Sequence, residues 1–136
     1  MYLLDTNVIS ELRKPQADAN VVSWAKGIIA PRLYISAITL KELETGVLRM
    51  ERRDPVQGKL LRSWLTRHVM PAFEARILPV DAAVALRCAS LHVPDQANES
   101  DALIAATALV HGLTVVTRNV SDFRSSGVAL INPWEQ

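Results

Sequence analysis

The chain has 136 residues, 49% of them hydrophobic, and its 15 lysines and arginines nearly balance its 14 aspartates and glutamates. This length and apolar content suit a single domain over residues 1–136 with a sizeable buried core. The formal net charge of +1 gives no bulk signal for a nucleic acid, a membrane surface or an acidic partner, so any charge signal must be local.

Short apolar runs typical of strands alternate along the chain with helical patterns. In chain order we expect a strand at 2–4, a helix after Asn20, a strand at 33–35, a helix after Thr39, a helical stripe over 56–69, a strand at 77–80, a helix from Asp81, an all-round apolar helix over 102–110, and strands at 114–117 and 128–131. This alternation predicts an α/β domain with a mostly parallel sheet, because parallel neighbours need a crossover that a helix supplies. Functional groups are then expected at the C-terminal ends of the strands.

The apolar run over 102–110 is interrupted by Thr107 and is too short to span a bilayer. No basic segment followed by a long apolar stretch stands at the N-terminus. Cys88 is the single cysteine, which excludes an internal disulfide and favours a reducing compartment. We therefore expect a cytoplasmic protein without membrane contact and interpret Cys88 as an inert core residue.

Three aspartates follow predicted strands, namely Asp5, Asp81 and Asp122. Asp81 also stands where a helix N-cap is expected. Asp5 is the hardest to explain structurally, because an acid at the end of a buried strand loses hydration and needs hydrogen bonds, a cation or a metal in compensation.

Two further acids, Glu42 and Asp101, lie near predicted helix starts. Thr39 and Glu42 have the spacing of a capping box, and Asn98 precedes Asp101 as an expected N-cap. If Glu42 and Asp101 converged with Asp5 and Asp122, their repulsion would require a divalent cation. Oxygen-only ligands favour Mg²⁺ or Mn²⁺ over zinc.

Four stretches of the chain are together specific for one family. They are LLDTNVISEL at 3–12, YISAITLKELETGV at 34–47, ESDALIAATALVHGLTVVTRNVSDF at 99–123 and NPW at 132–134. In these stretches the sequence resembles the PIN-domain ribonucleases, specifically the VapC toxins of toxin–antitoxin pairs and their FitB-like branch. The similarity runs in order over essentially the whole chain and implies the PIN-domain fold, with a central parallel sheet flanked by helices.

The resemblance implies that Asp5, Glu42 and Asp101 form the acidic core of a catalytic site and that Asp122 is the fourth acid. One common family pattern instead has its fourth acid at the position of Asn119. Asp5 and Asp101 would hold the metal, directly or through waters.

The same resemblance places Thr6, Asn7, Ser36 and Thr117 around the pocket, where hydroxyls and an amide can orient carboxylates without adding charge. For Ser36 and Asn7, a structural role in satisfying backbone groups at the strand ends remains an equal alternative. Asp81 would lie at the far edge of the sheet, away from the acids.

The implied activity is hydrolysis of single-stranded RNA by a metal-activated water, which leaves a 5′-phosphate and a 3′-hydroxyl. Glu42 or Asp122 would orient the water or help to hold a second metal. No histidine is required. His68, His92 and His111 lie in helical patterns without matching partners, so a nuclease that uses paired histidines is a poor fit.

The resemblance also implies a homodimer and a cognate VapB- or FitA-like antitoxin that inserts a basic side chain among the acids. DNA would be contacted only through that antitoxin. Exposed parts of two apolar stripes are interface candidates, namely those of Leu60, Trp64 and Leu65 and of Val21 and Trp24.

Eight of the 15 basic residues lie between Lys41 and Arg76. A solvated helix surface is a simpler interpretation of these residues than a binding track for RNA phosphates.

Two alternatives remain at this stage. The chain is either a working ribonuclease or a catalytically weak FitB-like subunit of a DNA-bound toxin–antitoxin regulatory complex, and the intact acidic set favours the enzyme. A metal-dependent phosphatase ranks behind both, because Asn7 stands where that class has a second acid.

Overall fold

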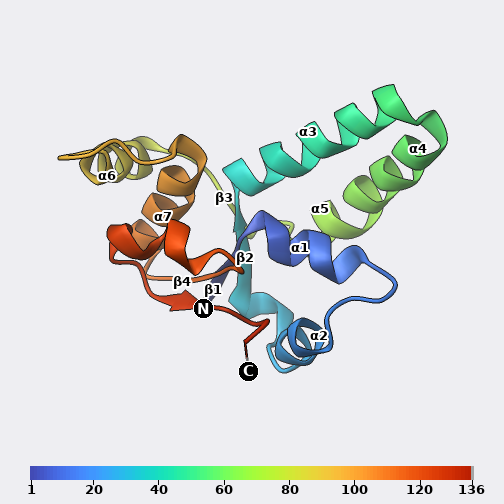
Figure 1. The fold of residues 1–136 in the computed structure, drawn as a ribbon, viewed down its shortest axis with the longest axis horizontal. Coiled ribbons are helices and arrows are strands. Elements are labelled where there is room, and N and C mark those ends of the chain that lie inside the picture. Colours follow the sequence, from blue (N-terminus) through green and yellow to red (C-terminus); the bar gives the residue numbers. More distant parts are fainter. Residues whose placement is uncertain (136) are drawn as a thin grey trace.

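The computed structural model describes residues 1–135, and its centre is a five-stranded sheet in the order β3-β2-β1-β4-β5 (Figure 1). All four neighbouring strand pairs are parallel. The strands are β1 Tyr2–Leu4, β2 Leu33–Ser36, β3 Ile77–Leu78, β4 Thr114–Val116 and β5 Leu130–Ile131. The predicted parallel α/β architecture is therefore confirmed, although β3, β4 and β5 are shorter than the sequence suggested.

Helices connect the strands and lie on both sides of the sheet (Figure 1). The α-helices are α1 Thr6–Arg13, α2 Ala19–Lys26, α3 Ala37–Arg53, α4 Pro55–Trp64, α5 Met70–Ala72, α6 Ala82–Leu91 and α7 Glu99–His111. Shorter helical segments are η1 Ala30–Arg32, the π-helical η2 Leu65–Val69, η3 Val120–Asp122 and η4 Arg124–Ser126. In residues 1–135, no helix is long and apolar enough to cross a membrane.

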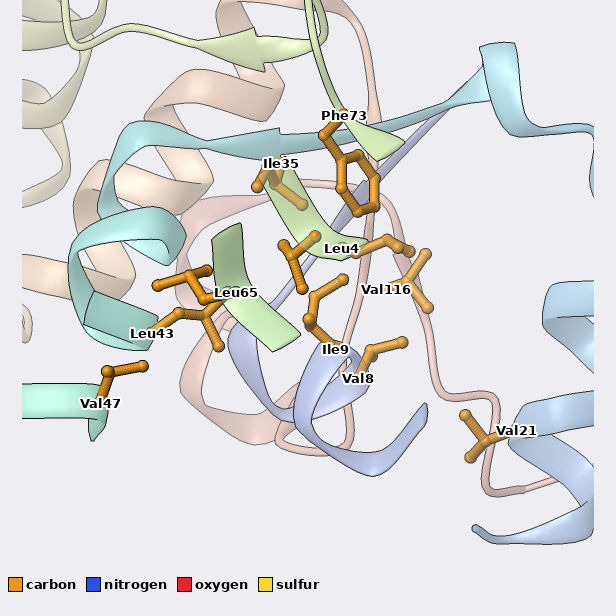
Figure 2. Close-up of a cluster of buried hydrophobic side chains, with 11 residues drawn as sticks. Leu4, Val8, Ile9, Val21, Ile35, Leu43, Val47, Leu65, Phe73 and Val116 are labelled. Atoms are coloured by element: carbon orange, nitrogen blue, oxygen red, sulfur yellow. The ribbon is translucent and has the colours of Figure 1, made fainter. Parts of the chain in front are cut away.

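The core has two parts because successive residues of a strand point to opposite faces of the sheet. Leu4 packs with Val8, Ile35 and Leu65 on one face (Figure 2). Its neighbour Leu3 belongs to the cluster on the other face. Covering both faces explains why the central strands are apolar without interruption.

Helix α7 is apolar all round, as the sequence indicated, and its buried side includes Ile104, Ala105 and Ala108. Gly112 ends it in the left-handed conformation, with φ 67°, which favours glycine at this position. The helix is therefore packed against both the sheet and α6.

Two predicted helix starts are wrong. Helix α3 begins at Ala37 and is capped by Ser36, whose Oγ accepts a hydrogen bond of 3.1 Å from the backbone N–H of Thr39. The capping box assigned to Thr39 and Glu42 therefore does not exist, and Glu42 is free for another partner. Helix α2 begins two residues earlier than expected, at Ala19, and is capped by Asp18.

The stripe predicted as one helix over 56–69 is divided into α4 and η2, followed by α5. Two of the proposed interface residues, Val21 and Leu65, are fully buried in the core, so they are not interface candidates. Leu60 remains exposed at 60%.

The sheet order fixes where a site can form. Strand β1 lies between β2 and β4, so the segments that leave these three strands begin at one edge of the sheet. Asp81 follows the edge strand β3 and caps α6, accepting a hydrogen bond of 3.0 Å from the N–H of Val84. Its capping role is confirmed.

Candidate metal-binding active site

Asp5 lies between β1 and α1 and is 7% exposed. Its Oδ1 accepts a hydrogen bond of 2.8 Å from the N–H of Thr6, and its Oδ2 accepts one of 2.9 Å from the hydroxyl of Thr117. Burial raises the pKa of Asp5, while these two hydrogen bonds oppose the rise. The carboxylate is thus held in one orientation in a site that disfavours its charge.

Thr117 follows β4 and is completely buried. Its oxygen also accepts from the N–H of Asn119 at 3.0 Å and lies 3.3 Å from the amide nitrogen of Asn7. The same Asn7 amide lies 3.4 Å from Asp5. A network of neutral donors therefore connects the ends of β1 and β4 around the carboxylate.

Glu42 is on the second turn of α3 and is joined to α1 through Thr6, whose hydroxyl donates a hydrogen bond of 2.7 Å to Oε1. The hydroxyl of Thr39, which is fully buried, lies 3.4 Å from that of Thr6. Sequence reasoning missed Thr39 as a neighbour of the site, although its spacing from Glu42 places both on one helix face. Ser36 acts as the α3 cap described above.

Asp101 lies in the first turn of α7, which Asn98 caps by accepting from the N–H of Asp101 at 3.1 Å. This predicted cap is confirmed. The pKa of Asp101 is raised to about 6, first by burial and then by the charges of Asp122, Asp5 and Glu42. The structure therefore brings the four acids into electrostatic contact in one region.

Asp122 is exposed at the end of η3. It lines a small hollow with Asp101, and its charge also raises the pKa of Asp5. Asn119, the alternative position for a fourth acid, precedes η3 and donates its backbone N–H to Thr117.

None of the four carboxylates forms an ion pair with a basic side chain in residues 1–135. Converging carboxylates without a cation are electrostatically unfavourable at neutral pH. The donor set is oxygen only, which fits a hard divalent cation such as Mg²⁺ or Mn²⁺. This part of the sheet edge is therefore suited to bind a cation and to act on an anionic substrate.

A second polar cluster lies between α6 and α7, where ligand atoms of Cys88, His92 and Glu99 are within 4.8 Å of one another. His92 has polar partners here, although neither is a histidine: its Nδ1 accepts from the N–H of Ala97 at 3.0 Å and its Nε2 lies 2.9 Å from Glu99. Since Nδ1 accepts, Nε2 carries the proton of the neutral ring and donates to Glu99.

Both ring nitrogens of His92 are therefore engaged in joining the two helices, and neither offers a free lone pair to a metal ion. Cys88 is buried, as expected for a core residue, and burial raises the pKa of its thiol. The four-residue spacing of Cys88 and His92 on a helix was the signal in the sequence for their proximity.

Comparison with known proteins agrees with the family resemblance of the sequence. A family model described as PIN domain matches residues 2–125. The chain is 41% identical over 142 residues to the toxin FitB of Neisseria gonorrhoeae, covering 98% of this chain and 99% of the relative. It is 39% identical over 143 residues to the VapC ribonuclease Y4jK of Sinorhizobium fredii, covering 99% of each.

Among solved structures, the crystal structure of FitAcB from Neisseria gonorrhoeae superimposes with a TM-score of 0.93 at 39% identity, covering 100% of both chains. A structure of FitAB bound to a DNA fragment gives a TM-score of 0.92 at 37% identity, covering 100% of this chain and 97% of the other.

Proposed function

The chain belongs to the PIN domain family, and on that basis we propose that it is a metal-dependent endoribonuclease and the toxin of a toxin–antitoxin pair. The observation that carries the proposal is the convergence of Asp5, Glu42, Asp101 and Asp122, which have no basic ion-pair partner in residues 1–135. Burial and then the charges of the other three acids raise the pKa of Asp101 to about 6. Similarity to relatives named VapC ribonuclease and toxin FitB supports RNA as the substrate class.

Asp5 and Asp101 would hold the cation. When bound, Mg²⁺ or Mn²⁺ supplies positive charge at the scissile phosphate and makes water a better nucleophile. Thr117 and Asn7 keep the Asp5 carboxylate in position, since both contact its Oδ2. Their role is to fix the ligand before substrate arrives.

Among residues 1–135, one carboxylate oxygen of Glu42 accepts a hydrogen bond and the other does not. Thr6 holds Oε1, and Oε2 accepts a proton from the attacking water. The water oxygen bonds to phosphorus and the bond from phosphorus to the 3′-oxygen breaks, which leaves a 5′-phosphate and, after protonation by solvent, a 3′-hydroxyl. Asp122, at the exposed end of the cluster, would orient the water or hold a second cation.

We also propose that the chain binds a cognate antitoxin, a small DNA-binding protein that inserts a basic side chain among the acids. Support comes from solved relatives that are toxin–antitoxin complexes, one of them bound to DNA. An inserted cation would offset the same repulsion as the metal and would compete with it. Contact with DNA would be indirect, through the antitoxin.

The test is cleavage of single-stranded RNA by purified, antitoxin-free protein, with Mg²⁺ or Mn²⁺ and with a chelator. We expect metal-dependent cleavage by the parent and none by Asp101→Asn. Asp81→Asn is the matched control, because Asp81 caps α6 at the edge strand, and it should cleave like the parent. Cleavage that survives chelation, or equal cleavage by Asp101→Asn, would refute the nuclease assignment and favour the regulatory role.

A further inference from the structure

A groove of about 210 Å³ opens directly beside the acids, among α1, α3 and α4. It shares Thr6 and Glu42 with the acidic cluster and extends to Arg13 and Lys14 at the end of α1. Contacts of α1 and α4 with α3 bring these helices together, as Figure 1 shows. We call it the Gly46 groove, because Gly46 of α3 lines it without a side chain.

The Gly46 groove is electrically polar. One end carries the Glu42 carboxylate, and the other carries two cations. Lys14 pairs with Glu11 at 3.0 Å, but its ammonium has three donors and two remain. Within the described residues Arg13 has no acidic partner, and its guanidinium lies 5.7 Å from the ring centroid of Trp64.

This pattern matches one nucleotide of a single-stranded nucleic acid. Lysine and arginine bind phosphate, while bases stack on aromatic rings and on guanidinium planes. The volume is below the range of about 300–1,000 Å³ that encloses a drug-sized ligand, so the groove suits a single nucleotide unit. A larger hollow of about 630 Å³ on α4 and η2 is lined by Lys59 and Arg67 but by none of the four acids, so it is separate from the acidic cluster.

We propose that the Gly46 groove is a nucleotide subsite that holds the nucleotide next to the scissile phosphate of single-stranded RNA. Arg13 and Lys14 bind its phosphate, and its base packs against the Arg13–Trp64 pair. This assignment rests on the proposed ribonuclease function and adds to it a substrate-binding site separate from the metal ligands.

Gly46 gives a steric test that leaves the protein core alone. A Cβ placed on Gly46 meets nothing within 4 Å, so Gly46→Leu starts a side chain from open space and extends it into the groove. Gly46→Ala, which adds the Cβ alone, is the small matched control. Binding of a fluorescein-labelled single-stranded RNA octamer is measured by anisotropy in chelator, which prevents metal-dependent cleavage. Circular dichroism melting checks that each variant folds.

We expect Gly46→Leu to bind the octamer at least about fivefold more weakly than Gly46→Ala, the loss of about one base-stacking contact. Arg13→Gln should also weaken binding and reduce its salt dependence. Arg87→Gln, an equal charge change on the exposed side of α6, should not. Equal binding by the two Gly46 variants, or no measurable binding by the parent, would overturn the subsite.

Failure of the two proposals can be told apart. If the parent cleaves RNA with Mg²⁺ and Gly46→Leu binds and cleaves it equally well, only the subsite proposal is refuted. If the parent binds RNA in a Gly46-dependent way but never cleaves it, only the nuclease proposal is refuted. If Gly46→Leu instead abolishes binding of the adjacent gene's product and leaves RNA binding intact, the groove is a protein-binding site and the proposal is wrong.

Discussion

The hydroxyl of Thr117 donates a hydrogen bond of 2.9 Å to Oδ2 of Asp5, although 112 positions separate the two residues. The bond joins the ends of β1 and β4, and it opposes the rise in the pKa of Asp5 that burial causes. It is also buried, so removing it leaves a carboxylate that water cannot easily satisfy.

We predict that Thr117→Val, which keeps the shape but removes the hydroxyl, destabilises the protein by about 1–3 kcal/mol. It should lower RNA cleavage at least about tenfold at pH 7, with partial recovery at higher pH as Asp5 ionises. Thr107→Val is the control, because Thr107 is also fully buried but bonds only to a backbone carbonyl of α7. Equal cleavage by the two variants would contradict a positioning role for Thr117.

Asp101 should make the metal-free protein less stable at neutral pH than in acid. Its pKa is about 6 in the folded protein against an ordinary 3.8, so the folded state holds the proton more tightly than the unfolded state. The associated stability is complete below pH 3.8 and is lost as the pH rises through about 6.

Asp101→Asn removes the loss of stability that ionisation of Asp101 causes at neutral pH. We predict a melting temperature at pH 7 that is about 2–5 °C above the parent's, corresponding to about 1 kcal/mol after allowance for solvent screening of a partly exposed group. The difference should shrink toward zero near pH 4. Scanning calorimetry in chelator across this range measures it, and a constant difference would show that Asp101 ionises normally.

A divalent metal should make the melting temperature of the parent higher than that of Asp101→Asn, the reverse of their order in chelator. A ligand that binds only the folded state stabilises it by mass action. Mg²⁺ or Mn²⁺ is therefore expected to raise the melting temperature of the parent but to have little effect on Asp101→Asn. An equal rise in both proteins would place the metal elsewhere.

Two glycines of the α3–α4 hairpin should respond oppositely to alanine. A Cβ on Gly58 would overlap the backbone of Glu51 in α3, so Gly58→Ala must separate the helices and should cost about 1–3 kcal/mol. Gly46→Ala meets open space and should be neutral or stabilise by up to about 1 kcal/mol. Urea denaturation of both variants compares them directly.

Self-association is expected through exposed apolar residues of the same hairpin. Leu48, Val56 and Leu60 are each more than half exposed there, and an apolar surface of this kind is typical of subunit contacts. Light scattering should show a dimer, and Leu60→Glu should shift it toward monomer. A parent that remains monomeric at high concentration would exclude this homodimer.

The sequence was most informative where local pattern and topology agree. Asp5 could be singled out because a buried strand ends at it, and Asn98 could be identified as a cap from spacing alone. The parallel sheet followed from alternation of strands and helices. Spatial proximity of the acids, by contrast, came from family resemblance, because no local pattern brings residues 5 and 101 together.

Where several residues compete for one role, tertiary context decided. Ser36 rather than Thr39 caps α3, since the chain leaves β2 one turn earlier than the apolar pattern suggested. The partners of His92 depend on a loop that turns back toward α6. Likewise, the charge of Asp122 raises the pKa of Asp101 because η3 carries Asp122 toward it, and η3 is too short to give a periodic pattern in the sequence.

The strand order has a consequence for synthesis of the protein. The four acids are contributed by segments from near the start of the sequence to near its end, and η3, which carries Asp122, follows β4, the strand that pairs with β1. At translation rates of about 5–20 residues per second, roughly 6 to 23 s separate the synthesis of Asp5 from that of Asp122. The acidic site therefore cannot be completed until Asp122 has been synthesised, however early the other three acids are in place.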